Sequence, residues 1–150
     1  MKAKIEHHRM VDALVGTSRI NPEDFAYKTS PNRLRSLSYA LAGWIYMLRR
    51  QKNTRIQGVA SIGIIGLALW LGIEPISWAI LILTITMVWM AEFINAAVEA
   101  AIDLSTSEFH PMAKVGKDVA SAAVLLGVMA SIIIGLIILL PPLLTKLGWG

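Results

Sequence analysis

The chain has 150 residues, a length that allows one domain. Apolar residues make up 55% of it, more than in ordinary soluble domains. The sequence has no cysteine, which excludes disulfide, haem-thiolate and iron–sulfur chemistry. Its net charge of +4 comes without a basic patch interleaved with aromatic residues, so the charge does not indicate nucleic-acid binding.

The first 55 residues are polar and charged, and we expect no cleavable signal peptide there. Residues 1–31 predict a solvated polar extension with partial order at most, because prolines interrupt them and no apolar period emerges. Residues 33–50 differ, since leucines and aromatic residues recur at helical spacing between pairs of arginines. This pattern predicts a basic amphipathic helix in the membrane interface, which can also pack as an ordinary helix.

Three long apolar runs follow the amphipathic segment. They predict membrane-spanning helices over residues 56–73, 76–103 and 119–141, since about 20 apolar residues cross a bilayer core of about 30 Å. Small residues punctuate these spans and favour close packing and self-association. The alternative, a soluble protein with buried helices, would need far more polar surface than residues 56–144 provide.

Basic residues are distributed unevenly about the spans. Eleven of the 14 Lys and Arg residues precede the first span, Lys114 and Lys117 lie between the second and third, and only Lys146 follows the third. The positive-inside rule therefore predicts that the N-terminus and the 104–118 loop are cytoplasmic. The turn at Glu74 and the C-terminus are expected on the outer side.

Four polar residues form a stripe at the end of the second span: Glu92, Asn95, Glu99 and Asp103. At about 100° per residue they fall within about 80° of one another on one helix face. Carboxylates facing lipid are unfavourable, so we expect this face to line a protein interior or a wet cleft. Glu92 is the deepest and suits a general base, whereas Glu99 suits an Mg²⁺ ion that bridges nucleotide phosphates. The alternative is a structural polar seam between helices.

The loop after this stripe adds further charged residues. A lysine beside the membrane, such as Lys117, can neutralise the charge of a transferred phosphate. A snorkelling lysine next to a solvated acid explains Lys117–Asp118 equally well, and His110 alone is a weak signal. The chain has no Walker A motif, no Gly-rich kinase loop and no zinc-ligand spacing.

Residues 91–124 resemble the signature of the bacterial diacylglycerol kinase and undecaprenol kinase family. That signature reads E-x-x-N-x-x-x-E-x-x-x-D, then E-x-H and K-D-x-x-S-A-A, and every position matches in AEFINAAVEAAIDLSTSEFHPMAKVGKDVASAAV. The broader likeness covers residues 33–141 and implies an all-α membrane protein of the bacterial plasma membrane. Its parts would be three transmembrane helices plus an N-terminal amphipathic interfacial helix, assembled as a homotrimer with shared active sites. Residues 32–144 would form the kinase domain and 145–150 a short tail.

The resemblance also implies ATP as phosphoryl donor with Mg²⁺ as cofactor, and a membrane lipid alcohol as acceptor. Glu92 would be the catalytic base, Glu99 and Gln51 would bind the metal, and Asn95 and Asp103 would support that site. The nucleotide would lie near Tyr39, Glu99, Glu108, His110, Lys117 and Asp118, and the lipid near Glu92 and Ser121.

Gln51 departs from the family pattern, because many members carry a metal-binding glutamate at the end of the surface helix. An amide is a weaker magnesium ligand than a carboxylate, so either one ion is bound less tightly or Gln51 contacts the nucleotide. Asn32 takes the place of a familiar arginine, although Arg33 and Arg35 are near. These changes concern ATP binding more than the reaction.

The lipid stays open at this point: diacylglycerol would give phosphatidic acid, and undecaprenol would give undecaprenyl phosphate. A small proton-coupled transporter is a function of another class, but such proteins usually show internal repeats or interrupted helices. A non-catalytic relative of the kinases is a third alternative, motivated by Gln51.

Overall fold

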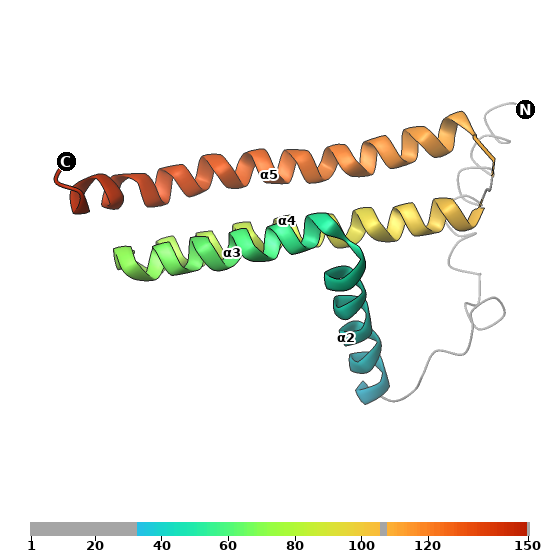
Figure 1. Cartoon of the computed structure of the whole chain (residues 1–150), viewed down its shortest axis with the longest axis horizontal. Coiled ribbons are helices and arrows are strands. Elements are labelled where there is room, and N and C mark those ends of the chain that lie inside the picture. Colours follow the sequence, from blue (N-terminus) through green and yellow to red (C-terminus); the bar gives the residue numbers. More distant parts are fainter. Residues whose placement is uncertain (1–32, 106–107, 150) are drawn as a thin grey trace, which may run out of the picture. The chain divides into compact units, whose positions relative to one another are not determined.

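Four helices make up the part of the chain that the computed structural model describes, residues 33–105 and 108–149. They are α2 (Arg33–Arg50), α3 (Lys52–Leu71), α4 (Pro75–Ser105) and α5 (Pro111–Lys146) (Figure 1). Of these, α3, α4 and α5 are each long and apolar enough to cross a membrane. The prediction of an all-α membrane protein with three spans is therefore confirmed. The extension predicted over residues 1–31 lies outside the described residues.

Local chemistry sets where α3 ends and α4 begins. Gly72 adopts the left-handed conformation, with φ 68° and ψ 45°, and its N–H donates to the carbonyls of Ala68 and Leu69. Glycine suits this position because a side chain would strain a left-handed backbone. Pro75 then opens α4, where its missing N–H is not needed. The two spans are thus joined by a turn of only residues 72–74.

The last helix, α5, is longer at both ends than the 119–141 span expected from hydropathy. His110 caps its start, where Nδ1 accepts a hydrogen bond from the Met112 N–H at 3.2 Å. Pro141 and Pro142 lie inside the helix near its far end, as membrane helices tolerate. Hydropathy marks only the apolar stretch, whereas the helix itself begins in polar sequence.

The helices α4 and α5 lie side by side, and α3 packs less extensively against both (Figure 1). A glycine permits a close approach of α4 and α5, since a Cβ added at Gly116 would lie 2.8 Å from the Ile102 side chain. Near the other end of the spans, Ala68, Leu81 and Leu139 join the three helices in one buried cluster. The bundle is therefore held by contacts at both ends.

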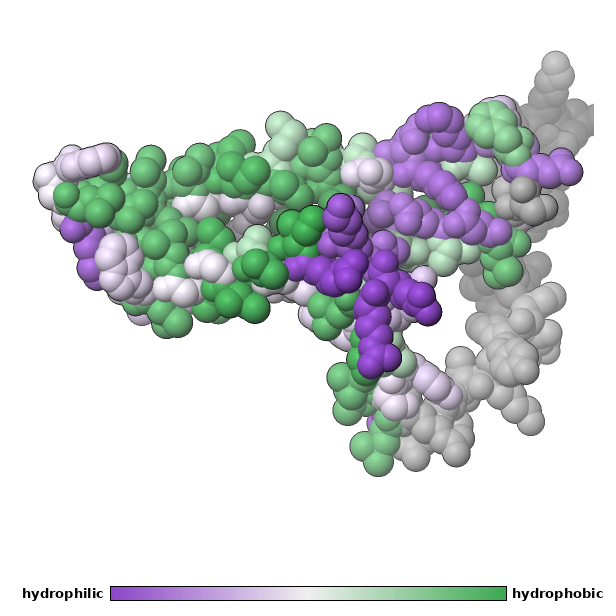
Figure 2. Space-filling view, in the orientation of Figure 1, coloured by the Kyte–Doolittle hydropathy of each residue, from purple (hydrophilic) through white to green (hydrophobic). Residues whose placement is uncertain are grey.

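The outer surface of the three spans is apolar. Figure 2 shows hydrophobic residues over most of the length of α3, α4 and α5, and hydrophilic residues gathered where α4 ends and α5 begins. Large side chains such as Ile62, Leu83, Leu126 and Ile137 are more than half exposed. Such a surface would be an aggregation hazard in water, but it is the expected contact surface for lipid or a second subunit in a bilayer.

The helix α2 is the most amphipathic of the four and carries Arg49 and Arg50 in its last turn. The chain divides into two compact units, and the second begins at Gly43 and contains α3, α4 and α5. Within this second unit, Met47 is buried and Trp44 stacks on the ring of Trp89. The predicted N-terminal helix is present, and its last two turns contribute to the bundle.

Candidate active site

The polar stripe predicted from the sequence lies on α4, and its burial decreases along the helix. Glu92 is buried, with 8% of its surface exposed. Asn95 and Glu99 are half-buried, and Asp103 is exposed. The stripe therefore runs from the interior of the bundle to its polar end, and only the deepest carboxylate is largely shielded by protein.

Asn95 orients the next carboxylate of the stripe. Its Nδ2 donates to Glu99 Oε1 at 3.0 Å, one helical turn further along α4. Its Oδ1 is buried and has no hydrogen-bond partner among the described residues. Buried polar atoms of native proteins are nearly always paired, so such an oxygen commonly marks a place for a ligand, an ion or water. Asn95 thus positions Glu99 and leaves one acceptor beside it.

Lys117 brings positive charge from α5 to the stripe. Its ammonium group forms an ion pair with Asp103 across the two helices, beside the close contact at Gly116. Lys114 and Asp118 form a second ion pair within α5. All four side chains are at least 40% exposed, so the pairs contribute little stability and a phosphate can replace the carboxylate partner.

The other predicted ligand residues lie near the start of α5 or on α2. His110 is exposed and caps α5 through Nδ1, a structural role that histidine seldom takes. Glu108 precedes it and is also exposed. Ser121 lies one turn after Lys117, so the two share a face of α5. Tyr39 lies on α2 and is 65% exposed.

Gln51 separates α2 from α3. Its backbone is extended, with φ −94° and ψ 116°, at the N-cap position of α3, yet its side chain makes no capping hydrogen bond. The backbone N–H donates to the carbonyl of Met47 at 3.0 Å. The backbone of Gln51 is therefore anchored while its half-buried amide is not used to cap the helix.

Among the described residues, no three His, Asp or Glu side chains are close enough together to hold a metal ion. An ion that arrives with a nucleotide needs fewer protein ligands, because phosphates and water fill most of its coordination shell. Glu99, next to the unpartnered Asn95 oxygen, fits such a nucleotide-borne Mg²⁺. These two side chains offer too few oxygen ligands to hold a metal ion without the phosphates.

An aromatic cluster next to Glu92 was not predicted from the sequence. The ring of Trp44 lies 5.0 Å from the rings of both Trp89 and Phe93, measured between centroids. Trp89 Nε1 also donates to Ser61 Oγ at 3.1 Å, which ties α4 to α3. The i, i+4 spacing of Trp89 and Phe93 is the signal that could have revealed part of this cluster.

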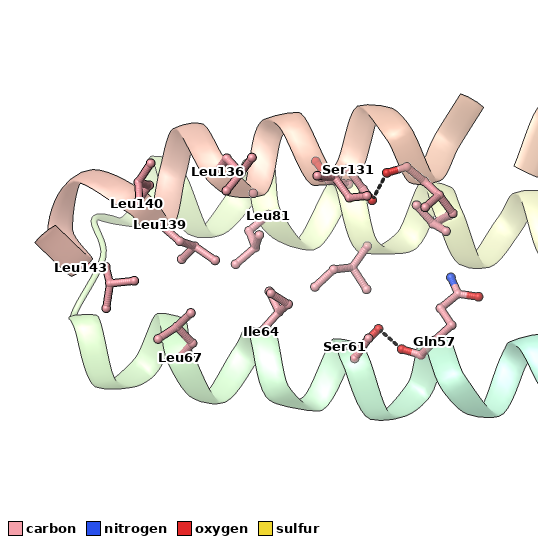
Figure 3. A pocket seen from close by; sticks show the side chains of 17 residues that line it. Gln57, Ser61, Ile64, Leu67, Leu81, Ser131, Leu136, Leu139, Leu140 and Leu143 are labelled. Carbon is pink, nitrogen blue, oxygen red and sulfur yellow. Dashed lines mark hydrogen bonds between the residues drawn. The ribbon is translucent and has the colours of Figure 1, made fainter. Parts of the chain in front are cut away.

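A cavity of about 470 Å³ between α3, α4 and α5 was not predicted either (Figure 3). Val88, one turn before Glu92 on α4, lines one end of it. Most of the lining is aliphatic, and its polar residues are Gln57, Ser61, Thr84 and Ser131. No local sequence pattern marks a space that three separate helices line together.

Comparison with known proteins bears on the whole of this region. The sequence model of the family described as prokaryotic diacylglycerol kinase matches residues 38–139. The matched region contains the entire stripe on α4 and the lysines at the start of α5. It also contains α3, α4 and most of α5, and thus all but Leu140 and Leu143 of the residues that line the cavity.

Several curated proteins are similar over most of this length. A diacylglycerol kinase of Synechocystis sp. is 40% identical over 121 residues, which are 80% of this chain and 69% of the relative. An undecaprenol kinase of Bacillus subtilis is 35% identical over 95 residues, 63% of this chain and 77% of the relative. A diacylglycerol kinase of Escherichia coli is 34% identical over 98 residues, 65% of this chain and 77% of the relative.

Proposed function

Because this chain belongs to the prokaryotic diacylglycerol kinase family, and is thus a membrane-bound lipid kinase that uses ATP, we propose that it converts diacylglycerol to phosphatidic acid. The relative at 40% identity is a diacylglycerol kinase. Undecaprenol is the second candidate substrate, because the relative at 35% identity is an undecaprenol kinase. The observation that carries the proposal is Glu92, a buried carboxylate one turn beyond an apolar cavity.

In the proposed reaction Glu92 acts as the general base. Its carboxylate accepts the proton of the lipid hydroxyl as the hydroxyl oxygen bonds to the γ-phosphorus of ATP. The bond between that phosphorus and the oxygen that bridges it to ADP breaks, and ADP leaves. The burial of Glu92 suits this role, because it keeps water from competing with the lipid hydroxyl as phosphate acceptor.

Residues nearer the polar end would stabilise the charge of the phosphates. Mg²⁺ bound with ATP would neutralise charge on the phosphate oxygens, and Glu99 would hold it with Asn95 alongside. Gln51 would complete the metal site or contact the nucleotide. Lys117 would exchange Asp103 for the transferred phosphate and stabilise its negative charge in the transition state. The exposure of the Lys117–Asp103 pair supports this exchange, since little energy opposes it.

The rest of the nucleotide would lie along exposed residues, which can contact a soluble ligand; Glu108, His110 and Asp118 also occupy positions of the family motif, whereas Tyr39 lies on α2. Ser121 would border the lipid, since it follows Lys117 on the same face of α5. The residues proposed to contact the nucleotide away from the metal are Tyr39, Glu108, His110 and Asp118.

We further propose that the polar end of the bundle faces the cytoplasm of a bacterial plasma membrane. Arg49 and Arg50 lie close in the sequence to the start of α3, and Lys114 and Lys117 lie near the start of α5. The positive-inside rule assigns these ends of the spans to the cytoplasm, where ATP is available. A homotrimer with active sites shared between neighbours is proposed as the working assembly. The apolar surface of the spans supports association with further copies.

Turnover in detergent micelles tests the proposal, with release of ADP measured with diacylglycerol, with undecaprenol and without lipid. We expect diacylglycerol-dependent ADP release and formation of phosphatidic acid. Faster turnover of undecaprenol would select the second candidate. Absence of any lipid-dependent turnover would contradict the kinase proposal and favour the transporter or the non-catalytic alternative.

A further inference from the structure

The C-terminal segment (residues 140–149) lies outside the part of the chain that matches the family. The match ends at residue 139, whereas α5 continues to Lys146. After the helix, Gly148 adopts the left-handed conformation with φ 78°, and the N–H of Trp149 donates to the carbonyl of Leu144 at 2.9 Å. This hydrogen bond is that of a Schellman motif, in which a glycine ends a helix without strain. The segment therefore has a defined helical end.

A pair of prolines lies where this segment begins. Pro141 and Pro142 are inside α5 and have no N–H to donate to the carbonyls of Ile137 and Ile138. The helix therefore lacks two of its usual backbone hydrogen bonds at this point, and a helix bends more easily where such bonds are missing. Contacts with other helices must then fix the direction of the final turns.

The end of α3 offers such a contact. The N–H of Gly72 donates to the carbonyls of Ala68 and Leu69 at 3.1 and 3.3 Å, and neither bond uses the carbonyl of Trp70. The last carbonyls of a helix have no partner within it, and they form the negative end of the helix dipole. A cation from elsewhere in the fold is therefore stabilised at this position.

Lys146 of α5 is that cation. Its ammonium group donates to the Trp70 carbonyl at 2.6 Å and lies 4.8 Å from the centroid of the Trp70 ring. One lysine thus makes a charge-assisted hydrogen bond and a cation–π contact with the same residue. Figure 1 shows the final turns of α5, in red, near the end of α3. Lys146 is also the one basic residue after the third span, where the positive-inside rule disfavours a lysine, and this contact gives a reason for its presence.

The rest of the bundle does not depend on this contact. The buried cluster of Ala68, Leu81 and Leu139 joins the three spans before the prolines of α5 are reached. The hydrogen bond from Trp89 to Ser61 joins α4 to α3 nearer the polar stripe. Loss of the Lys146 contact should therefore release only the final turns of α5 and leave the bundle folded.

We propose that the C-terminal segment acts as a clasp between α5 and α3 at the end of the bundle opposite the polar stripe. Lys146 is a C-cap that α5 supplies to α3, and the prolines loosen the segment so that this contact sets its position. The clasp fixes the end of α3 and the turn that follows it. This inference does not depend on the proposed lipid kinase function.

Distance measurements between two spin labels test the clasp. The chain has no cysteine, so labels can be attached specifically at Leu69→Cys on α3 and Leu147→Cys after α5, both at exposed positions. Lys146→Met keeps most of the side-chain length and removes the charge and the N–H donors. In phosphatidylcholine vesicles, pulsed EPR should give a narrow distance distribution for the labelled parent. The distribution should be at least twice as broad in Lys146→Met.

Two further variants are the controls for this measurement. Lys52→Met makes the same change at an exposed lysine at the other end of α3, and it should leave the distribution narrow. Lys146→Arg keeps a cation with N–H donors, and it should stay close to the parent. A narrow distribution in Lys146→Met would overturn the clasp. Equal broadening in Lys52→Met would also overturn it, because the effect would then be a general one of removing a lysine.

Thermal unfolding in detergent tests whether the two contacts act together. Lys146→Met should lower Tm by about 2–4 °C, the shift expected for the loss of one modest interaction in a chain of this size. Trp70→Leu removes the ring and leaves the backbone carbonyl, so it should lower Tm by less. The double variant should lose less than the sum of the two single losses, because both changes affect one contact. Fully additive losses would contradict the joint contact.

The prolines are tested in the same labelled protein. Pro141→Ala combined with Pro142→Ala restores two backbone N–H groups to α5 and should stiffen the helix at this point. Lys146→Met should then broaden the distance distribution less than it does with the prolines present. Equal broadening in both backgrounds would show that the prolines do not loosen the segment and would overturn that part of the proposal.

Discussion

Replacement of Glu92 by glutamine tests the chemical step most directly. Glu92→Gln keeps the shape of the side chain and removes its ability to accept the hydroxyl proton. Because only 8% of Glu92 is exposed, bulk water has little access to serve as a substitute base. We therefore expect the upper part of the usual range for a lost general base, a decrease of about 10³–10⁴-fold in kcat. This decrease corresponds to about 4–5 kcal/mol in the activation free energy.

The assay measures phosphatidic acid formation at saturating ATP and diacylglycerol, together with ATP binding to the same protein. ATP affinity should stay close to that of the parent, because the Asn95–Glu99 hydrogen bond lies further along α4 and is left in place. Glu74→Gln is the matched control, since it makes the same change at an exposed carboxylate in the turn between α3 and α4. Near-normal turnover in Glu92→Gln would refute the base assignment. Loss of ATP binding would place Glu92 in the nucleotide site instead.

Three further predictions concern the metal, the ion pair and the orientation. If residue 51 is a metal ligand, Gln51→Glu should lower the Mg²⁺ concentration that gives half-maximal activity. An unchanged Mg²⁺ concentration for half-maximal activity, together with weaker ATP affinity, would show that Gln51 contacts the nucleotide. Asp103→Asn should lower the free energy of unfolding by at most about 1 kcal/mol, because its pair with Lys117 is exposed, whereas Lys117→Met should mainly lower turnover. A larger loss of stability in Asp103→Asn would indicate that the pair holds α4 to α5. A reporter fused after residue 150 is expected to lie outside the cytoplasm, so a reporter that is active only there should show activity. Activity of a reporter that works only in the cytoplasm would reverse the proposed topology.

Hydropathy and spacing were sufficient to predict the class of fold. A bilayer requires helices long enough to cross it with every backbone group paired internally, so three apolar runs predict three spans. The stripe from Glu92 to Asp103 follows from the constant rotation per residue of a helix, which places its members on one face before any packing is known. The family relation also follows from local sequence, since its motif lies within residues 91–124.

Contacts between helices could not be predicted in this way, because they depend on which faces meet. The pairing of Lys117 with Asp103 requires α5 to fold back along α4. His110 was expected beside the nucleotide, and its use as a helix cap depends on the backbone at the start of α5.

Gln57 shows the same distinction most clearly. In the sequence it is one polar residue at the edge of an apolar run, and it could equally face the membrane interface. In the folded bundle its amide is buried at the end of a cavity that residues from α3, α4 and α5 line. The hydrophobic effect selects apolar residues for a helix without specifying their partners, whereas a cavity and an unpaired amide exist only once the helices are packed together.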